Sequence, residues 1–65
     1  MPKEYASLDV EIIHISGGAV LCNDGDQEGW IPKSVIEDWD DDSYSVGDQA
    51  ELEVEEWFAE KEGWI

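Results

Sequence analysis

The stretch that decides the fold is residues 8–15, which read LDVEIIHI. Apolar and acidic side chains alternate at its start, and this period of two is typical of a strand with one buried face. Leu8, Val10 and Ile12 are therefore expected to face a core, while the two acidic residues between them face water. Residues 49–56 alternate in the same way and predict the last strand. Its two faces carry Ala50, Leu52 and Val54 on one side, and Glu51, Glu53 and Glu55 on the other.

The segment between these two stretches contains turns and short strands. Ser16-Gly17-Gly18 predicts a tight turn into a second strand over residues 19–23, because paired glycines accept the positive φ of hairpin turns. Residues 24–29 predict another turn, and Trp30-Ile31 begins a short third strand. Pro32 has no N–H to donate, so it ends this strand or leaves it at a sheet edge.

Residues 32–37 are expected to form one helical turn, and residues 38–45 an acidic loop. Residues 46–48 turn into the last strand, and a helix over residues 56–62 is expected to end at Gly63. The chain, residues 1–65, thus predicts a single α+β domain. Its architecture is expected to be a small curled antiparallel sheet or partial barrel of about four strands with a short C-terminal helix.

The charge of the chain excludes several functions. Eighteen Asp and Glu against three Lys, in 65 residues, give a formal net charge of −15. Direct binding of nucleic acid is excluded, because it depends on Lys and Arg that neutralise phosphates. Anionic membrane surfaces are excluded for the same reason. An enzyme is not expected either, since a domain of this size buries only roughly 60% of its surface and has little room for a catalytic pocket.

A folded protein of a reducing cytoplasm is nevertheless expected. Hydrophobic residues make up 42% of the chain, which is too many for a disordered acidic segment. Cys22 is the only cysteine, so no intramolecular disulfide can form, and the start of the chain predicts no signal peptide. His14 is the only imidazole; a Cys/His catalytic pair would lack an orienting third group. Cys22 is therefore interpreted as a small buried hydrophobe and His14 as a half-exposed strand residue.

A calcium loop is a competing interpretation of residues 24–29. Asp24, Asp26 and Glu28 match the first ligand positions of such a loop, but Pro32 and Val35 stand where later ligands are required. The simpler interpretation is a hairpin turn, since Asp and Gly tolerate a left-handed backbone. Weak binding of Ca²⁺ or Mg²⁺, here or at the acids of residues 38–42, stays an alternative, and no dedicated metal site or cofactor is predicted.

The remaining pattern is the distribution of carboxylates. Alternate residues on one face of a strand are about 6.6 to 6.8 Å apart, so residues 51–55 would present a row of like charges at roughly two base-pair rises of DNA. Asp9 and Glu11 would form a shorter row. A net charge of −15 exceeds the roughly 2 to 8 that solubility asks of a small domain. The excess favours mimicry of nucleic acid toward a basic partner.

Two aromatic residues in the acidic loop are candidate anchors for that partner. Trp39 lies between two aspartates and Tyr44 comes two residues after Asp42, and large aromatics dominate interface energetics. The alternative is that Trp39 folds back over the sheet and closes the core. Trp30 and Trp57 are assigned to the core. The predicted partner-binding residues are Asp38, Trp39, Asp40, Asp41, Asp42, Tyr44, Glu51, Glu53, Glu55 and Glu56.

Two resemblances add to these interpretations. Residues 29–37 (GWIPKSVIE), 46–48 (VGD) and 56–61 (EWFAEK) resemble a family of small uncharacterised proteins from phages, prophages and mobile elements, over most of the chain from about Asp9 onward. Compared with that family, this chain has more acids in residues 38–42 and in the last strand. Its size and acidity are also similar to those of DNA-mimic anti-CRISPR inhibitors, in particular those of type I-C systems.

The second resemblance implies a function. It predicts a monomeric or dimeric inhibitor that occupies the DNA-binding surface of a CRISPR effector, the Cascade complex, and so keeps target DNA out. Two alternatives remain. One is a small barrel module that binds a basic protein during phage assembly, and the other is a weak divalent-cation-binding domain.

Overall fold

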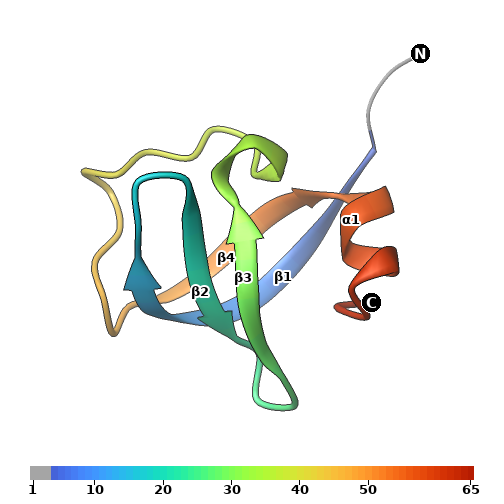
Figure 1. Ribbon diagram of the computed structural model, residues 1–65, viewed down its shortest axis with the longest axis horizontal. Coiled ribbons are helices and arrows are strands. Elements are labelled where there is room, and N and C mark those ends of the chain that lie inside the picture. The colour runs from blue at the N-terminus through green and yellow to red at the C-terminus, as the bar shows by residue number, and fades with distance from the viewer. Residues whose placement is uncertain (1–3) are drawn as a thin grey trace.

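The computed structural model describes residues 4–65, which form one four-stranded antiparallel sheet and a short C-terminal helix (Figure 1). The elements are β1 (Tyr5–Ile15), β2 (Ala19–Asn23), β3 (Glu28–Pro32), the 3₁₀ helix η1 (Lys33–Val35), β4 (Gln49–Glu55) and α1 (Glu56–Lys61). The strand order is β3-β2-β1-β4, so the last strand pairs with the first. The predicted α+β fold is confirmed, although β1 begins three residues before Leu8 and β3 begins at Glu28 rather than Trp30.

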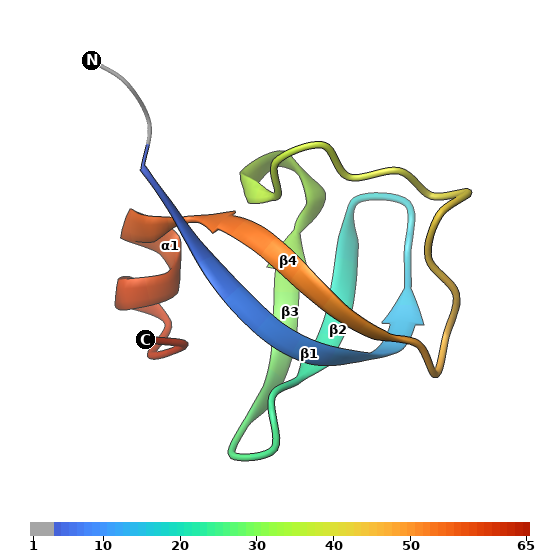
Figure 2. The ribbon, with the colours of Figure 1, turned by 180° about the vertical axis from the view of Figure 1, so that it is seen from behind.

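The length of β1 explains the curl of the sheet. Its first half pairs with β4, from Tyr5 opposite Glu55 to Glu11 opposite Gln49, and its second half pairs with β2. A bulge between Ile12 and His14 bends the strand where it passes from one partner to the other. Figure 2 shows the β1–β4 pair crossing diagonally in front of β2 and β3.

The sheet curls further after β3 but does not close. Directly after η1 in the chain, Ile36 forms an isolated antiparallel bridge with Val54 of β4. The backbone N–H of Glu37 then donates a hydrogen bond to the carbonyl oxygen of Glu53 (2.7 Å). The chain thus reaches the edge of β4 that β1 leaves unpaired, and a partial barrel results.

The core lies inside this curl. The inner sheet face contributes the predicted apolar side chains, including Leu8, Val10 and Ile12, and α1 adds Phe58 and Ala59 at the open end. Gly63 ends the helix with φ of 79°, a left-handed conformation that favours glycine, as predicted. The backbone N–H of Trp64 then donates to the carbonyl oxygen of Ala59 (2.7 Å), which brings the Trp64 ring into the core.

The assignment of Trp30 and Trp57 to the core is wrong, because the two side chains are 47% and 56% exposed. In β3, Trp30 precedes the buried Ile31, so alternation places it on the outer face of the sheet. In α1, Phe58 and Ala59 occupy the buried side and Trp57 faces solvent. Among residues 4–65, no helix is long and apolar enough to span a membrane.

Candidate partner-binding surface

The register of β1 and β4 determines where the acidic rows lie. Asp9 is directly opposite Glu51, Ser7 is opposite Glu53, and Glu11 is opposite Gln49. Cross-strand partners project from the same face of a sheet, so the two rows predicted from the sequence are neighbours on one outer surface. We call Asp9, Glu11, Glu51 and Glu53 the acidic sheet face.

Repulsion on the acidic sheet face is not offset by any lysine that the structure describes. Cβ atoms of directly opposite residues lie about 4.5 to 5.5 Å apart, so Asp9 and Glu51 place two like charges side by side. Among residues 4–65, none of the four carboxylates of this face forms an ion pair. Glu53 accepts a hydrogen bond from the Ser7 hydroxyl (2.7 Å), which holds one carboxylate in place. Within the described part of the chain, the face is acidic and has no paired cation.

The acidic row ends at Glu53 rather than at Glu55 or Glu56. The expectation that Glu55 presents a surface carboxylate is wrong: it is 8% exposed, and its Oε1 accepts a hydrogen bond from the Trp57 indole (2.9 Å). Helix α1 begins directly after Glu55 and folds Trp57 back toward it, which covers this end of the row.

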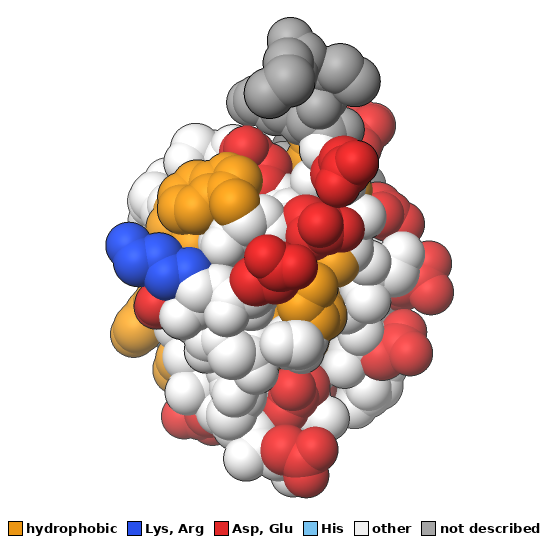
Figure 3. All heavy atoms as spheres, turned by 90° about the vertical axis from the view of Figure 1, so that its right-hand side faces the viewer, with side chains coloured by type: hydrophobic (Ala, Val, Ile, Leu, Met, Phe, Trp, Pro, Cys, Tyr) orange, Lys and Arg blue, Asp and Glu red, His pale blue; other side chains and the backbone are white. Residues whose placement is uncertain are grey.

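Glu56 belongs to a different acidic cluster, at the start of α1. The neighbouring charge of Glu4 raises its pKa above the ordinary value of 4.5, with smaller contributions from desolvation and from Glu60. Figure 3 shows this side of the molecule, where acidic side chains form a column next to a hydrophobic patch and a lysine. Carboxylates therefore also gather around α1, outside the paired part of β1 and β4 that carries the acidic sheet face.

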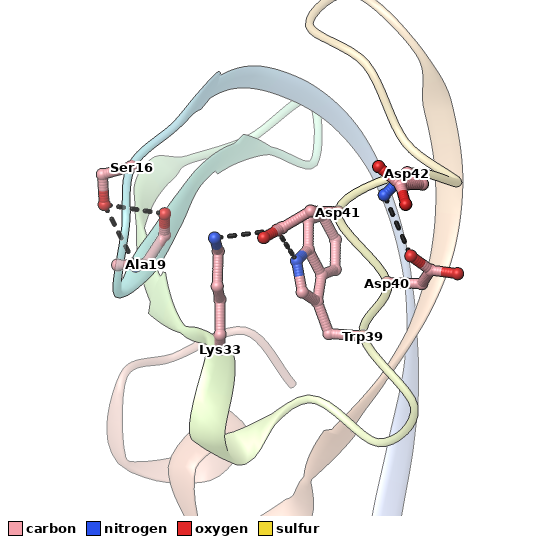
Figure 4. Close-up of polar contacts among 7 residues, drawn as sticks. All are labelled: Ser16, Ala19, Lys33, Trp39, Asp40, Asp41 and Asp42. Atoms are coloured by element: carbon pink, nitrogen blue, oxygen red, sulfur yellow. Dashed lines mark hydrogen bonds and ion pairs between the residues drawn. The ribbon is translucent and has the colours of Figure 1, made fainter.

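The acidic loop, residues 38–45, uses part of its charge to hold its own shape. The Oδ1 atom of Asp41 accepts hydrogen bonds from Lys33 Nζ (2.8 Å) and from the Trp39 indole N–H. These two donors, Lys33 first, lower the pKa of Asp41. Asp40 accepts from the Asp42 backbone N–H (2.9 Å) and from the Ser43 hydroxyl (3.1 Å). In Figure 4, Asp41 points toward Lys33, while Asp40 and Asp42 lie on the other side of the loop.

The two aromatic residues of the loop stack on each other. The Trp39 and Tyr44 rings are 4.7 Å apart at an interplanar angle of 15°, and both side chains pack half-buried against the core. Lys33 Nζ lies 6.0 Å from the centroid of the Trp39 ring. The alternative expectation for Trp39, that it folds back and closes the core, is confirmed. The Trp39 side chain therefore offers a partner less surface than an aromatic side chain that projects freely into solvent would offer.

The loop begins and ends next to the acidic sheet face. At its start, Glu37 is hydrogen-bonded to Glu53 of β4. At its end, the Gly47 N–H donates to the Ile12 carbonyl (2.6 Å) and the Ile12 N–H donates to the Asp48 carbonyl (2.8 Å), which extends the β1–β4 ladder. Both ends of the loop are therefore anchored by backbone hydrogen bonds to the strands that carry the acidic sheet face.

The hairpin interpretation of residues 24–29 agrees with the structure. Asp24 Oδ1 accepts hydrogen bonds from the backbone N–H groups of Asp26 and Gln27 (both 2.8 Å), with Gln27 the larger influence in lowering the Asp24 pKa. Gly25 takes φ of 101°, as the turn requires. Within residues 4–65, no group of three or more His, Cys, Asp or Glu side chains is placed to hold a metal ion.

Cys22 and His14 lie on opposite faces of the sheet. Cys22 is buried opposite Ile12, and burial raises the pKa of its thiol to about 11. His14 pairs with Leu21 and is exposed on the outer face. The sheet separates the two side chains, so they do not form a catalytic pair.

An aromatic cluster on the outer face was missed by reasoning from the sequence. The Trp30 and His14 rings meet edge to face, 5.9 Å apart at 88°, and Leu21 is the cross-strand partner of Trp30. The available signal was alternation within the strand, because two adjacent strand residues face opposite sides and the buried Ile31 leaves Trp30 on the outer face. Comparisons of the chain with family models, curated proteins and solved structures find no match. The resemblance to phage-borne inhibitors accordingly stays a prediction.

Proposed function

We propose that this protein is an acidic inhibitor that occupies the DNA-binding surface of a basic partner, and that the partner is a CRISPR effector of the Cascade type. The observation that carries the proposal is the β1–β4 register, which places four carboxylates on one outer face. A further argument is their cost: opposed like charges destabilise a sheet, so a face that keeps them favours a role outside folding.

The physics of the acidic sheet face fits competition with DNA. Carboxylates along each strand are about 6.6 to 6.8 Å apart, near two base-pair rises along the axis of DNA, and the hydrogen-bonded ladder fixes the backbone that carries them. A net charge of −15 steers the protein toward a basic channel and speeds association. Each exposed ion pair contributes only roughly 0 to 1 kcal/mol, so inhibition depends on several carboxylates acting together.

A charge-matched pair of variants tests the proposal. D9N/E51Q/E53Q removes three charges from the acidic sheet face, and D26N/E60Q/E62Q removes three exposed charges elsewhere. Binding of labelled target DNA to a type I-C Cascade complex is followed by fluorescence anisotropy as each protein is titrated in. At roughly 0.5 kcal/mol per contact, the first variant should need about tenfold more protein for half-inhibition. The second should resemble the wild type.

Two outcomes of this titration would overturn the proposal or its mechanism. Equal weakening by both variants would show that net charge, and not the sheet face, carries inhibition. If the effector keeps its DNA at saturating wild-type protein, competition is rejected, and the module that binds a basic assembly protein becomes the better interpretation. Circular dichroism of each variant confirms that it is folded before it is compared.

A further inference from the structure

The four tryptophans of the chain differ in how much of each ring a partner can reach. Trp64 is buried in the core. Trp39 is covered by Tyr44 on one ring face, and Lys33 lies over the same indole. Neither is a free recognition surface.

The two exposed tryptophans also differ from each other. The Trp57 indole N–H already donates to Glu55, and Lys61 follows one helical turn later, where it repels a cation. Trp30 is 47% exposed, and among residues 4–65 its indole N–H has no hydrogen-bond partner. Trp30 is therefore the tryptophan best placed to meet another molecule.

The surroundings of Trp30 are apolar on one side and acidic on the other. Leu21 and His14 support the ring from neighbouring strands. Glu28 lies two residues before Trp30 on the same face of β3, about 6.6 to 6.8 Å away. Glu28 pairs with Asn23, which pairs with Glu11 of the acidic sheet face. The exposed indole is thus continuous with that face across three strands.

Charge decides which occupant suits this surface. A second copy of the chain would bring another net charge of −15 against the same acids, so the occupant must be cationic. An exposed indole attracts a cation over its ring, and arginine does this best because its planar guanidinium both stacks on the ring and binds carboxylates. Lysine offers only a compact, strongly hydrated charge.

We propose that Trp30, flanked by Glu28 of the cross-strand row that leads to Glu11, receives an arginine side chain of the basic partner. The guanidinium stacks on the indole and its N–H groups face the carboxylates. This inference rests on the proposed function, because it names the partner residue that the same outer face would select. It adds that the surface discriminates between cations and does not respond to charge alone.

Two peptides of equal charge, nona-arginine and nona-lysine, test the inference without any effector complex. Their affinities for the full-length protein are measured by isothermal titration calorimetry at fixed ionic strength. The wild type should bind nona-arginine about three- to fivefold more tightly than nona-lysine. W30A should lose that preference while keeping its affinity for nona-lysine. W57A is the matched control, since it removes a comparably exposed tryptophan, and should keep the preference.

Several results would overturn the inference. Equal affinity of the wild type for both peptides, or a preference that survives in W30A, removes Trp30 as an arginine site. W30F, which keeps an aromatic ring, should retain part of the preference and guards against a misfolded W30A. Self-association of the wild type that W30A abolishes, measured by sedimentation, would assign the patch to a second copy.

The failures of the two proposals are distinguishable. If the arginine preference depends on Trp30 but the effector keeps its DNA, only the competition mechanism is rejected. If DNA is displaced in a manner that depends on the acidic sheet face while both peptides bind equally, only the arginine site is rejected.

Discussion

The acidic sheet face and the acidic loop look alike in the sequence, yet their carboxylates have opposite relations to the fold. On the sheet, Asp9 and Glu51 are held opposite each other by backbone pairing, and no cation among residues 4–65 joins them. In the loop, Asp41 joins Lys33 to the Trp39 indole. The sheet positions its charges despite their repulsion, whereas the loop depends on Asp41 for its conformation.

This difference separates two reasons for keeping an acid. A carboxylate that binds neighbouring donors contributes to the fold and needs no external partner to account for it. A carboxylate opposed to another carboxylate costs stability, so its retention favours a role in binding. By this criterion the acidic sheet face is a stronger candidate for partner contact than the acidic loop. Among the predicted loop residues, Asp41 is the weakest candidate, because its carboxylate already binds Lys33 and the Trp39 indole.

Trp39→Ala should have the largest effect on this comparison. The side chain packs half-buried against the core and stacks on Tyr44, so its loss removes the main apolar contact between the loop and the core. Truncating a buried tryptophan costs roughly 3 to 5 kcal/mol, and the partial burial of Trp39 predicts a cost near 2 to 3 kcal/mol. Urea unfolding followed by far-UV circular dichroism measures the change.

Tyr44→Ala and the double variant complete a thermodynamic cycle for this pair. A coupling of about 0.5 to 1.5 kcal/mol is expected for stacked aromatic rings. W30A is the control, because Trp30 lies outside the core and its removal should change stability much less. Equal destabilisation by W39A and W30A would mean that the loop does not close the core.

Two charge reversals of intermediate effect should move stability in opposite directions. Glu51→Lys places a cation opposite Asp9 and should stabilise the protein by roughly 0.2 to 1 kcal/mol. Asp41→Lys places a second cation beside Lys33 and removes the acceptor of the Trp39 indole, so it should destabilise the protein. Both substitutions change the net charge from −15 to −13, that is −15 + 2, and the midpoints of urea unfolding compare them directly. Stabilisation by both would show that net charge outweighs local geometry.

The sequence predicted which side chains of each strand face the core, but not which strands pair with each other. Alternation at Leu8 and at Leu52 was enough to identify which side chains enter the core, because that pattern is local. That Asp9 meets Glu51 depends on pairing between the first and last strands, which carries no local signal. Glu55 and Trp30 were misjudged because the start of α1 buries the first, while alternation with the buried Ile31 places the second on the outer face.

The smallest expected effect is a pH dependence in which repelled and bonded carboxylates act with opposite sign. Glu4 raises the pKa of Glu56 above 4.5, so folded protein takes up this proton more readily than unfolded protein, and stability rises as pH falls through the raised value toward 4.5. The pKa values of Asp41 and Asp24 lie below 3.8, chiefly because of Lys33 and of the Gln27 N–H, respectively. Their contribution is complete above 3.8 and is lost as pH falls through the lowered values.

Thermal unfolding between neutral pH and pH about 3 should therefore show Tm passing through a maximum in mildly acidic solution. Glu56→Gln should flatten the rise, because it removes the repelled charge at every pH. Asp41→Asn should lower Tm near neutral pH and reduce the fall below 3.8, because the bond to Lys33 is then weakened throughout. A Tm that falls steadily from neutral pH in the wild type would mean that bonded carboxylates outweigh repelled ones in the stability of the protein.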